Sequence, residues 1–146
     1  MKVFPSDSSF VVVLAKGESL TESLTSFMQD AAITSAWVQG LGAALSTTLV
    51  YYNLETKQYY PKEFTGPLEL TALQGNVVRG PEGPLLHLHG SFSDTEYRGI
   101  GGHIQDMIVG GTCELHIQPL TITASRAHDN ETGLNLLCEV PPHATA

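Results

Sequence analysis

Three histidines lie close together in one glycine-rich stretch of the sequence. His87 and His89 alternate with apolar residues over residues 86–92, which is the period-two pattern of a half-buried strand. Residues two apart on a strand point to the same face, with Cα atoms about 6.5–7 Å apart, so both rings can lean toward one point. His103 follows Gly101 and Gly102, which we expect to bend the chain and bring a third imidazole to the others.

Three imidazoles form a familiar ligand set for a divalent metal. Zinc binds neutral imidazole nitrogen at about 2.0–2.1 Å, and three protein ligands leave a fourth position for water. We therefore predict that His87, His89 and His103 are metal ligands, with zinc as the expected ion, although nickel, iron or copper also accept imidazole. The alternative interpretation is that these histidines bond only to backbone groups on a polar sheet face.

Three carboxylates are candidates for supporting the predicted ligands. Histidines that bind a metal usually donate their second ring N–H to an oxygen, and Asp94, Asp106 and Glu114 are acidic residues close to them in sequence. Asp94 is more typical of a turn in its Ser-Asp-Thr-Glu context, and Glu114 can instead pair with a neighbouring strand. Both interpretations remain open from the sequence.

The elements around this stretch are mostly strands. Residues 10–15 are β-branched and continuous, as in a strand covered on both faces. Ser19 and Glu22 form a capping box, and apolar residues then recur at helical spacing, which predicts a helix over residues 20–32. Further strands are expected at about 35–39, 43–52, 58–60, 68–78, 86–92, 109–117, 120–126 and 134–138. The predicted fold class is α+β, a largely antiparallel sheet with one main helix packed on one face.

Composition limits the classes of function. The chain has 146 residues and a net charge of −8, with only seven Lys and Arg, and these are scattered, which makes direct nucleic-acid binding doubtful. Its low charge content of 15% favours self-association. Cys113 and Cys138 share no motif spacing and no signal peptide is recognised, so a cytoplasmic location is expected. No apolar run is long enough to span a membrane.

Several motifs together resemble the plants-and-prokaryotes conserved (PPC) domain family over roughly residues 8–137. They are a strand-to-helix start at residues 10–18, Leu68-Glu-Leu-Thr-Ala-Leu-Gln-Gly-Asn-Val, Leu86-His-Leu-His-Gly-Ser-Phe-Ser-Asp, Gly101-Gly-His, Cys113-Glu-Leu-His-Ile and Glu131-Thr-Gly-Leu-Asn-Leu-Leu. The resemblance implies a curved antiparallel sheet and a homotrimer. We expect one such domain at residues 8–138, with flexible termini at 1–7 and 139–146.

The resemblance also bears on function. Plant members of the family carry an AT-hook that binds A·T-rich DNA, and this sequence has no Arg-Gly-Arg-Pro hook. The chain resembles the bacterial-type members, in which the equivalents of His87, His89 and His103 look like metal ligands. We favour a metal-binding module that binds a small molecule or has a regulatory role. A metal-dependent enzyme acting through metal-bound water and a DNA-associated protein are the alternatives, and the sequence does not decide whether the protein is an enzyme.

Overall fold

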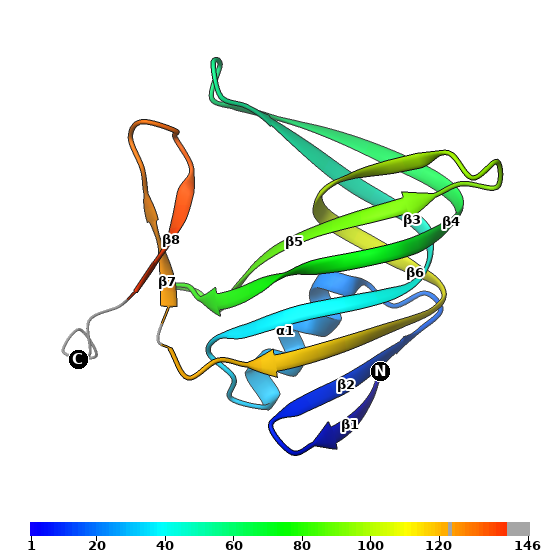
Figure 1. Ribbon diagram of the computed structural model, residues 1–146, viewed down its shortest axis with the longest axis horizontal. Coiled ribbons are helices and arrows are strands. Elements are labelled where there is room, and N and C mark those ends of the chain that lie inside the picture. The colour runs from blue at the N-terminus through cyan, green and yellow to red at the C-terminus, as the bar shows by residue number, and fades with distance from the viewer. Residues whose placement is uncertain (123, 140–146) are drawn as a thin grey trace.

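The computed structural model describes residues 1–122 and 124–139, which form eight strands and one helix (Figure 1). Their bounds in chain order are β1 Lys2–Ser6, β2 Ser9–Ala15, α1 Leu20–Asp30, β3 Ala36–Asn53, β4 Gln58–Arg79, β5 Pro84–Ser93, β6 Gly99–Pro119, β7 Ala124–His128 and β8 Asn135–Glu139. The expectation of a mostly antiparallel sheet with a single helix is confirmed for the described residues. No helix among them is long and apolar enough to cross a membrane.

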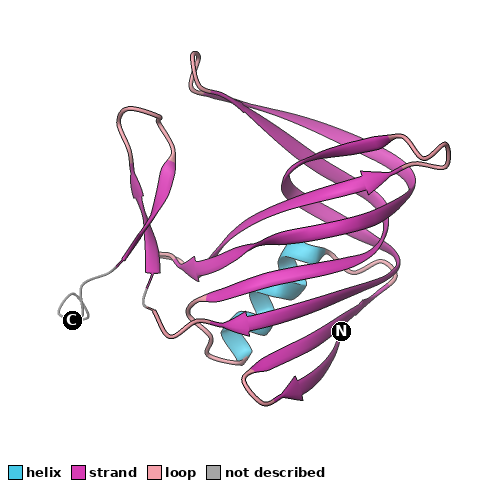
Figure 2. Cartoon of the chain, in the orientation of Figure 1, coloured by secondary structure: helices cyan, strands magenta, loops and turns pink. Residues whose placement is uncertain are grey.

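Six strands make one antiparallel sheet in the order β1-β2-β6-β3-β4-β5. The first residues of β6 also pair with the end of β5. The four strands β6, β3, β4 and β5 therefore form a closed ring of paired strands at that end. Figure 2 shows the strongly bent strands with the helix behind them. Strands β7 and β8 form a separate two-stranded hairpin.

The core lies on one side of the strands because burial alternates along them. On β5, Leu88 and Phe92 are buried, whereas His89 and Ser91 are exposed. Helix α1 begins after Ser19, whose side chain accepts from the backbone N–H of Glu22, as a capping residue does. The buried residues of α1 belong to the same apolar cluster as those of the strands; they are Leu20, Leu24, Phe27 and Met28.

The long strands differ from the sequence prediction. The segments expected at 35–39 and 43–52 form the single strand β3, and those at 58–60 and 68–78 form β4. The pairing of β3 with β4 stays continuous because the register shifts locally, for example between Gly40 and Gly42, as at a β-bulge. Pro61 and Pro67 lie between the two segments expected at 58–60 and 68–78, inside the continuous strand β4. They are tolerated because β4 pairs there with β3 alone, and proline is accepted where a strand is an edge.

The two chain ends also differ from expectation. Residues 2–6, expected in a flexible terminus, form β1 and pair with β2 from Lys2–Val13 to Ser6–Ser9. Every residue of β1 is exposed, so the sequence carries no burial pattern that would predict a strand. The strand expected at 120–126 lies at Ala124–His128 instead, and residue 123 is outside the described residues. In the terminus expected to be flexible at 139–146, Glu139 ends β8 and residues 140–146 lie outside the described residues.

Candidate metal centre

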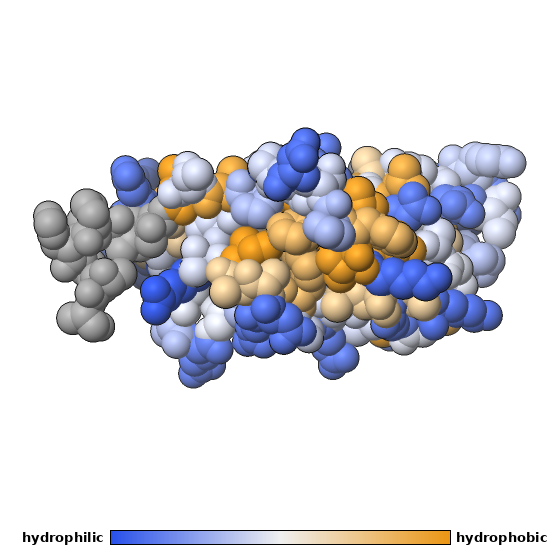
Figure 3. All heavy atoms as spheres, turned by 90° about the horizontal axis from the view of Figure 1, so that it is seen from below, coloured by the Kyte–Doolittle hydropathy of each residue, from blue (hydrophilic) through white to orange (hydrophobic). Residues whose placement is uncertain are grey.

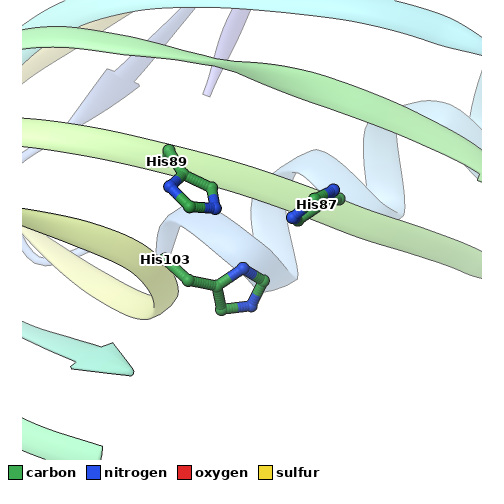
Figure 4. A group of neighbouring side chains, drawn as sticks. All are labelled: His87, His89 and His103. Carbon is green, nitrogen blue, oxygen red and sulfur yellow. The ribbon is translucent and has the colours of Figure 1, made fainter. Parts of the chain in front are cut away.

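His87, His89 and His103 come together on the sheet face opposite the core (Figure 4). His87 and His89 are two residues apart on β5, and His103 on β6 lies directly opposite His89. One ligand atom from each side chain lies within 4.8 Å of the others, and the ring centroids are 5.2, 5.2 and 5.4 Å apart. We call these three residues the histidine triad. It is the one group of three or more metal-ligating side chains found in the described residues.

The route by which His103 reaches the triad differs from the sequence prediction. Gly101 and Gly102 do not form a turn; they belong to β6 and pair with Ser91 and Gly90 of β5. A third imidazole therefore arrives through a strand pair, with the cross-strand spacing of an antiparallel ladder. The expected turn is wrong because glycine is also accepted in a strand where another backbone approaches closely.

The donor set fits a transition metal. Two nitrogens on one tetrahedral zinc, each bonded at about 2.0–2.1 Å, lie roughly 3.4 Å apart. The ligand atoms of the triad lie within 4.8 Å of one another, so a bound ion would require only a modest approach of the three rings. His89 is exposed, and a hollow of about 200 Å³ beside it is lined by Gln74, Ser91, Gly101 and Gly102 among others. The triad is thus open to solvent on that side.

The surroundings keep two of the imidazoles neutral near pH 7. The pKa of His87 is lowered to about 4, chiefly by burial and also by the charges of Arg126, His103 and His89. Burial also lowers the pKa of His103, helped by His89 and Arg126. Neutral imidazole is the form that binds a metal, so these rings present lone pairs without first losing a proton at pH 7.

Arg126 is a residue near the triad that sequence reasoning missed. Its Nη2 donates to Asn76 Oδ1 at 2.7 Å, and Asn76 lies opposite His87 in the β4–β5 ladder. Its Nη1 donates to the carbonyl oxygen of Asn135 at 3.0 Å. The alternation of side chains along β4 could have pointed to Asn76. No local sequence pattern, however, indicates that the β7–β8 hairpin places Arg126 beside it.

Asp94 and Asp106, expected to support the histidines, take part in other networks. The Asp94 carboxylate accepts the backbone N–H groups of Glu96 and Arg98 and the Arg98 Nε–H, at 2.8–3.0 Å. Asp106 Oδ1 accepts from the Ser19 hydroxyl, the Thr21 hydroxyl and the Thr21 backbone N–H, at 2.8–3.3 Å. Asp94 thus holds a turn, and Asp106 holds the start of α1.

Glu114, the third expected partner, lies elsewhere on β6. It pairs with Val13 on one side and Leu41 on the other, and it lines a depression together with His116. In the part of the chain that the structure describes, none of the three carboxylates is hydrogen-bonded to a ring of the histidine triad.

The comparisons with known proteins give both a family and similar solved structures. Residues 1–121 match the family model described as the Plants and Prokaryotes Conserved (PCC) domain. A metal-containing protein from Archaeoglobus fulgidus is 34% identical, with a TM-score of 0.84 over 95% of this chain and 100% of that one. No curated protein matches by sequence.

Two further solved structures are candidate DNA-binding proteins. One, from Bacteroides thetaiotaomicron, is 26% identical, with a TM-score of 0.90 over 94% of this chain and 96% of that one. The other, from Ralstonia eutropha, is 28% identical, with a TM-score of 0.89 and 96% of each chain covered. Because the family model spans most of the sequence, this chain belongs to the Plants and Prokaryotes Conserved domain family.

Proposed function

We propose that this protein is a metal-binding module in which His87, His89 and His103 hold one divalent transition metal, most favourably zinc. The observation that carries the proposal is the convergence of three imidazoles from two paired strands, with ligand atoms within 4.8 Å. The relative from Archaeoglobus fulgidus described as metal-containing supports it. Neutral His87 and His103 at pH 7 support it as well.

A ligand-binding or regulatory role fits the site better than catalysis. A bound divalent ion would supply Lewis acidity toward an oxygen-bearing ligand, and the open side at His89 gives such a ligand access. Proton transfer would need an acid or base within hydrogen-bond reach of that ligand. Of the three carboxylates that the sequence offered, Asp94 and Asp106 are already held by other donors, and Glu114 lies elsewhere on β6, opposite Val13 and Leu41.

The experiment is a zinc titration against a competing chelator, with protein purified without a histidine tag. We expect one zinc per chain for the wild type and no measurable site for the double variant His87→Ala/His89→Ala. His116→Ala is the matched control, because His116 lies on β6 outside the triad, and it should bind like the wild type. Unchanged affinity in the double variant would contradict the proposal.

A DNA-associated role is the second candidate. Two structural relatives described as candidate DNA-binding proteins favour it. The net charge of −8 and the seven scattered Lys and Arg oppose it, because affinity for duplex DNA grows with the number of phosphates neutralised. We therefore rank it below the metal-binding module.

We also propose that the chain forms a homotrimer. The outermost strand β1 carries exposed Val3 and Phe4, and Val11 of β2 is exposed as well. Figure 3 shows apolar side chains gathered on the face seen from below, the side on which β1 and β2 lie in Figure 1. An exposed edge strand and a contiguous apolar patch are features that a subunit contact covers. Light scattering at micromolar concentration should give about three times the chain mass, and a monomer would contradict the proposal.

Two finer points complete the proposal. We take α1 to cover one face of the sheet, which is supported by the Phe10 and Phe27 rings lying 5.3 Å apart, edge to face.

We also place the protein in the cytoplasm. Cys113 and Cys138 are both free thiols, and unpaired cysteines suit a reducing compartment.

A further inference from the structure

The guanidinium of Arg126 is a positive charge beside the histidine triad. Its hydrogen bond to Asn76 places it on the residue opposite His87, and its charge acts on both His87 and His103. Its two bonded partners, the Asn76 side-chain oxygen and the Asn135 carbonyl, are neutral. Among the described residues, the ion pairs involve other groups and no carboxylate pairs with Arg126.

This arrangement leaves the guanidinium with unused binding capacity. Arginine has five N–H donors in a planar fork, and Arg126 uses two of them within the described chain. Partial burial of the charge lowers the pKa of Arg126, since removing a charge from water is unfavourable without a counter-charge. The fork shape matches the paired oxygens of a carboxylate or phosphate group.

A metal at the triad makes the need for an anion greater. A divalent cation and a nearby guanidinium repel each other, and this repulsion is stronger in partly buried surroundings than in water. An anion at the same place attracts both. Binding of the cation and of the anion should therefore favour each other, and this coupling must be reciprocal.

We propose that Arg126 binds the carboxylate or phosphate group of a small anionic ligand at the histidine triad. This inference rests on the proposed metal-binding function, because it names the ligand class of that site. Asn76 is a positioning residue: its side-chain oxygen accepts from one nitrogen of the guanidinium and so fixes the direction of the fork.

The main experiment measures anion binding to protein loaded with Co²⁺, whose visible spectrum reports on its ligands. Acetate and inorganic phosphate are titrated separately, and acetamide serves as the neutral counterpart of acetate. We expect saturable spectral changes with one or both anions and none with acetamide. Arg126→Gln should weaken anion binding about tenfold or more, the scale of a lost charge-assisted hydrogen bond. It should bind Co²⁺ at least as tightly as the wild type, because a repelling charge is gone.

Arg79→Gln is the matched control. It makes the same change of charge at an exposed residue of β4, and Arg79 is not among the groups that lower the pKa of His87. Its anion affinity should equal that of the wild type. The anion that binds with higher affinity identifies the ligand class: tighter binding of acetate indicates a carboxylate ligand, and tighter binding of phosphate indicates a phosphate ligand.

A second measurement needs no variant and no metal. In the metal-free wild type, the NMR resonance of the Arg126 Nε–H should shift as acetate or phosphate is added. An unmoved resonance, or wild-type anion affinity in Arg126→Gln, would overturn the inference. If the wild type takes up no Co²⁺ while this resonance responds to anions, the metal-binding proposal fails and the role of Arg126 in binding anions stands.

Discussion

His89 and His103 are direct partners across the β5–β6 ladder. The next pairs of the same ladder are Gly90 with Gly102 and Ser91 with Gly101, so the register of this short segment fixes where the third imidazole lies. A slip of one residue would turn the side chain to the opposite face of the sheet. The geometry of the triad thus depends on strand register, and changes that disturb the register should affect metal binding without touching a histidine.

The first prediction concerns Gly75, which holds β4 close to β5 beside the triad. A Cβ at Gly75 would overlap the carbonyl oxygen of His87 and lie 2.8 Å from Leu88 Cα. Because both neighbours are backbone atoms, Gly75→Ala must displace a strand, and we expect a loss of about 1–3 kcal/mol in unfolding free energy. Urea unfolding measures that loss, and a zinc titration should show weaker binding in the same variant.

Gly99→Ala is the control for that substitution. A Cβ at Gly99 meets nothing within 4 Å, so both stability and zinc affinity should stay close to the wild type. If Gly75→Ala behaves like Gly99→Ala in both measurements, the triad does not depend on the β4–β5 approach.

The second prediction separates Asp106 from the metal site. Asp106 accepts three hydrogen bonds from Ser19 and Thr21 at the start of α1, so Asp106→Ala leaves these donors without their acceptor. We expect a loss of about 1–3 kcal/mol in unfolding free energy and an unchanged zinc affinity. Glu63→Ala, the same charge change at an exposed residue of β4, should alter neither. Weakened zinc binding in Asp106→Ala, at a temperature where the variant is folded, would instead show that Asp106 supports the histidines.

The third prediction is a pH dependence at Asp94. Backbone and side-chain hydrogen bonds from Arg98 lower the pKa of Asp94 below its ordinary value. A carboxyl with a lower pKa in the folded state stabilises that state above its unfolded pKa of about 3.9, and the contribution is lost as pH falls through the folded value. The backbone N–H resonances of Glu96 and Arg98 should therefore titrate together with a midpoint below about 3.9.

Asp94→Asn tests the same point by substitution. The variant should abolish that shared titration and leave zinc affinity unchanged, because the Asp94 carboxylate bonds within its own turn. A midpoint at or above the ordinary aspartate value would show that the turn does not hold this carboxylate in solution.

Sequence patterns predicted part of this site, and the reason for the rest is physical. The alternation around His87 and His89 is local, so their shared face could be read directly. His103 lies beside His87 and His89 as expected, but its position depends on pairing between residues 99–103 and β5, and pairing has no local signature. Arg126 reaches the triad through a hairpin bonded to Asn76, 50 residues away in sequence, and no periodicity reports such a contact.

The long strands show the same limit at the level of the fold. Glycines and prolines within β3 and β4 look like breakers because each weakens a strand taken alone. In the sheet, register shifts accommodate the glycines of β3, and the prolines of β4 lie where β4 pairs with β3 alone. A prediction from single segments therefore divides strands that the neighbouring strands keep continuous.

The last prediction concerns DNA. We expect no specific duplex binding by this chain near physiological salt, because binding scales with the phosphates neutralised and a strong non-specific binder contacts about six to ten of them. The chain has seven Lys and Arg against fifteen Asp and Glu. Two are already engaged: Arg98 pairs with Asp94 and Glu96, and Lys57 bonds to the Asn130 carbonyl.

A mobility-shift assay with A·T-rich duplex at about 150 mM salt checks this, since screening at that ionic strength leaves close contacts intact. A G·C-rich duplex of equal length serves as the comparison, because minor-groove readers separate the two compositions. Assembly into a trimer would multiply the acidic residues along with the few basic ones, so it does not alter the expectation. A salt-sensitive shift at submicromolar protein would reveal a basic surface that the separate chain does not have, and it would raise the DNA-associated role above the metal-binding one.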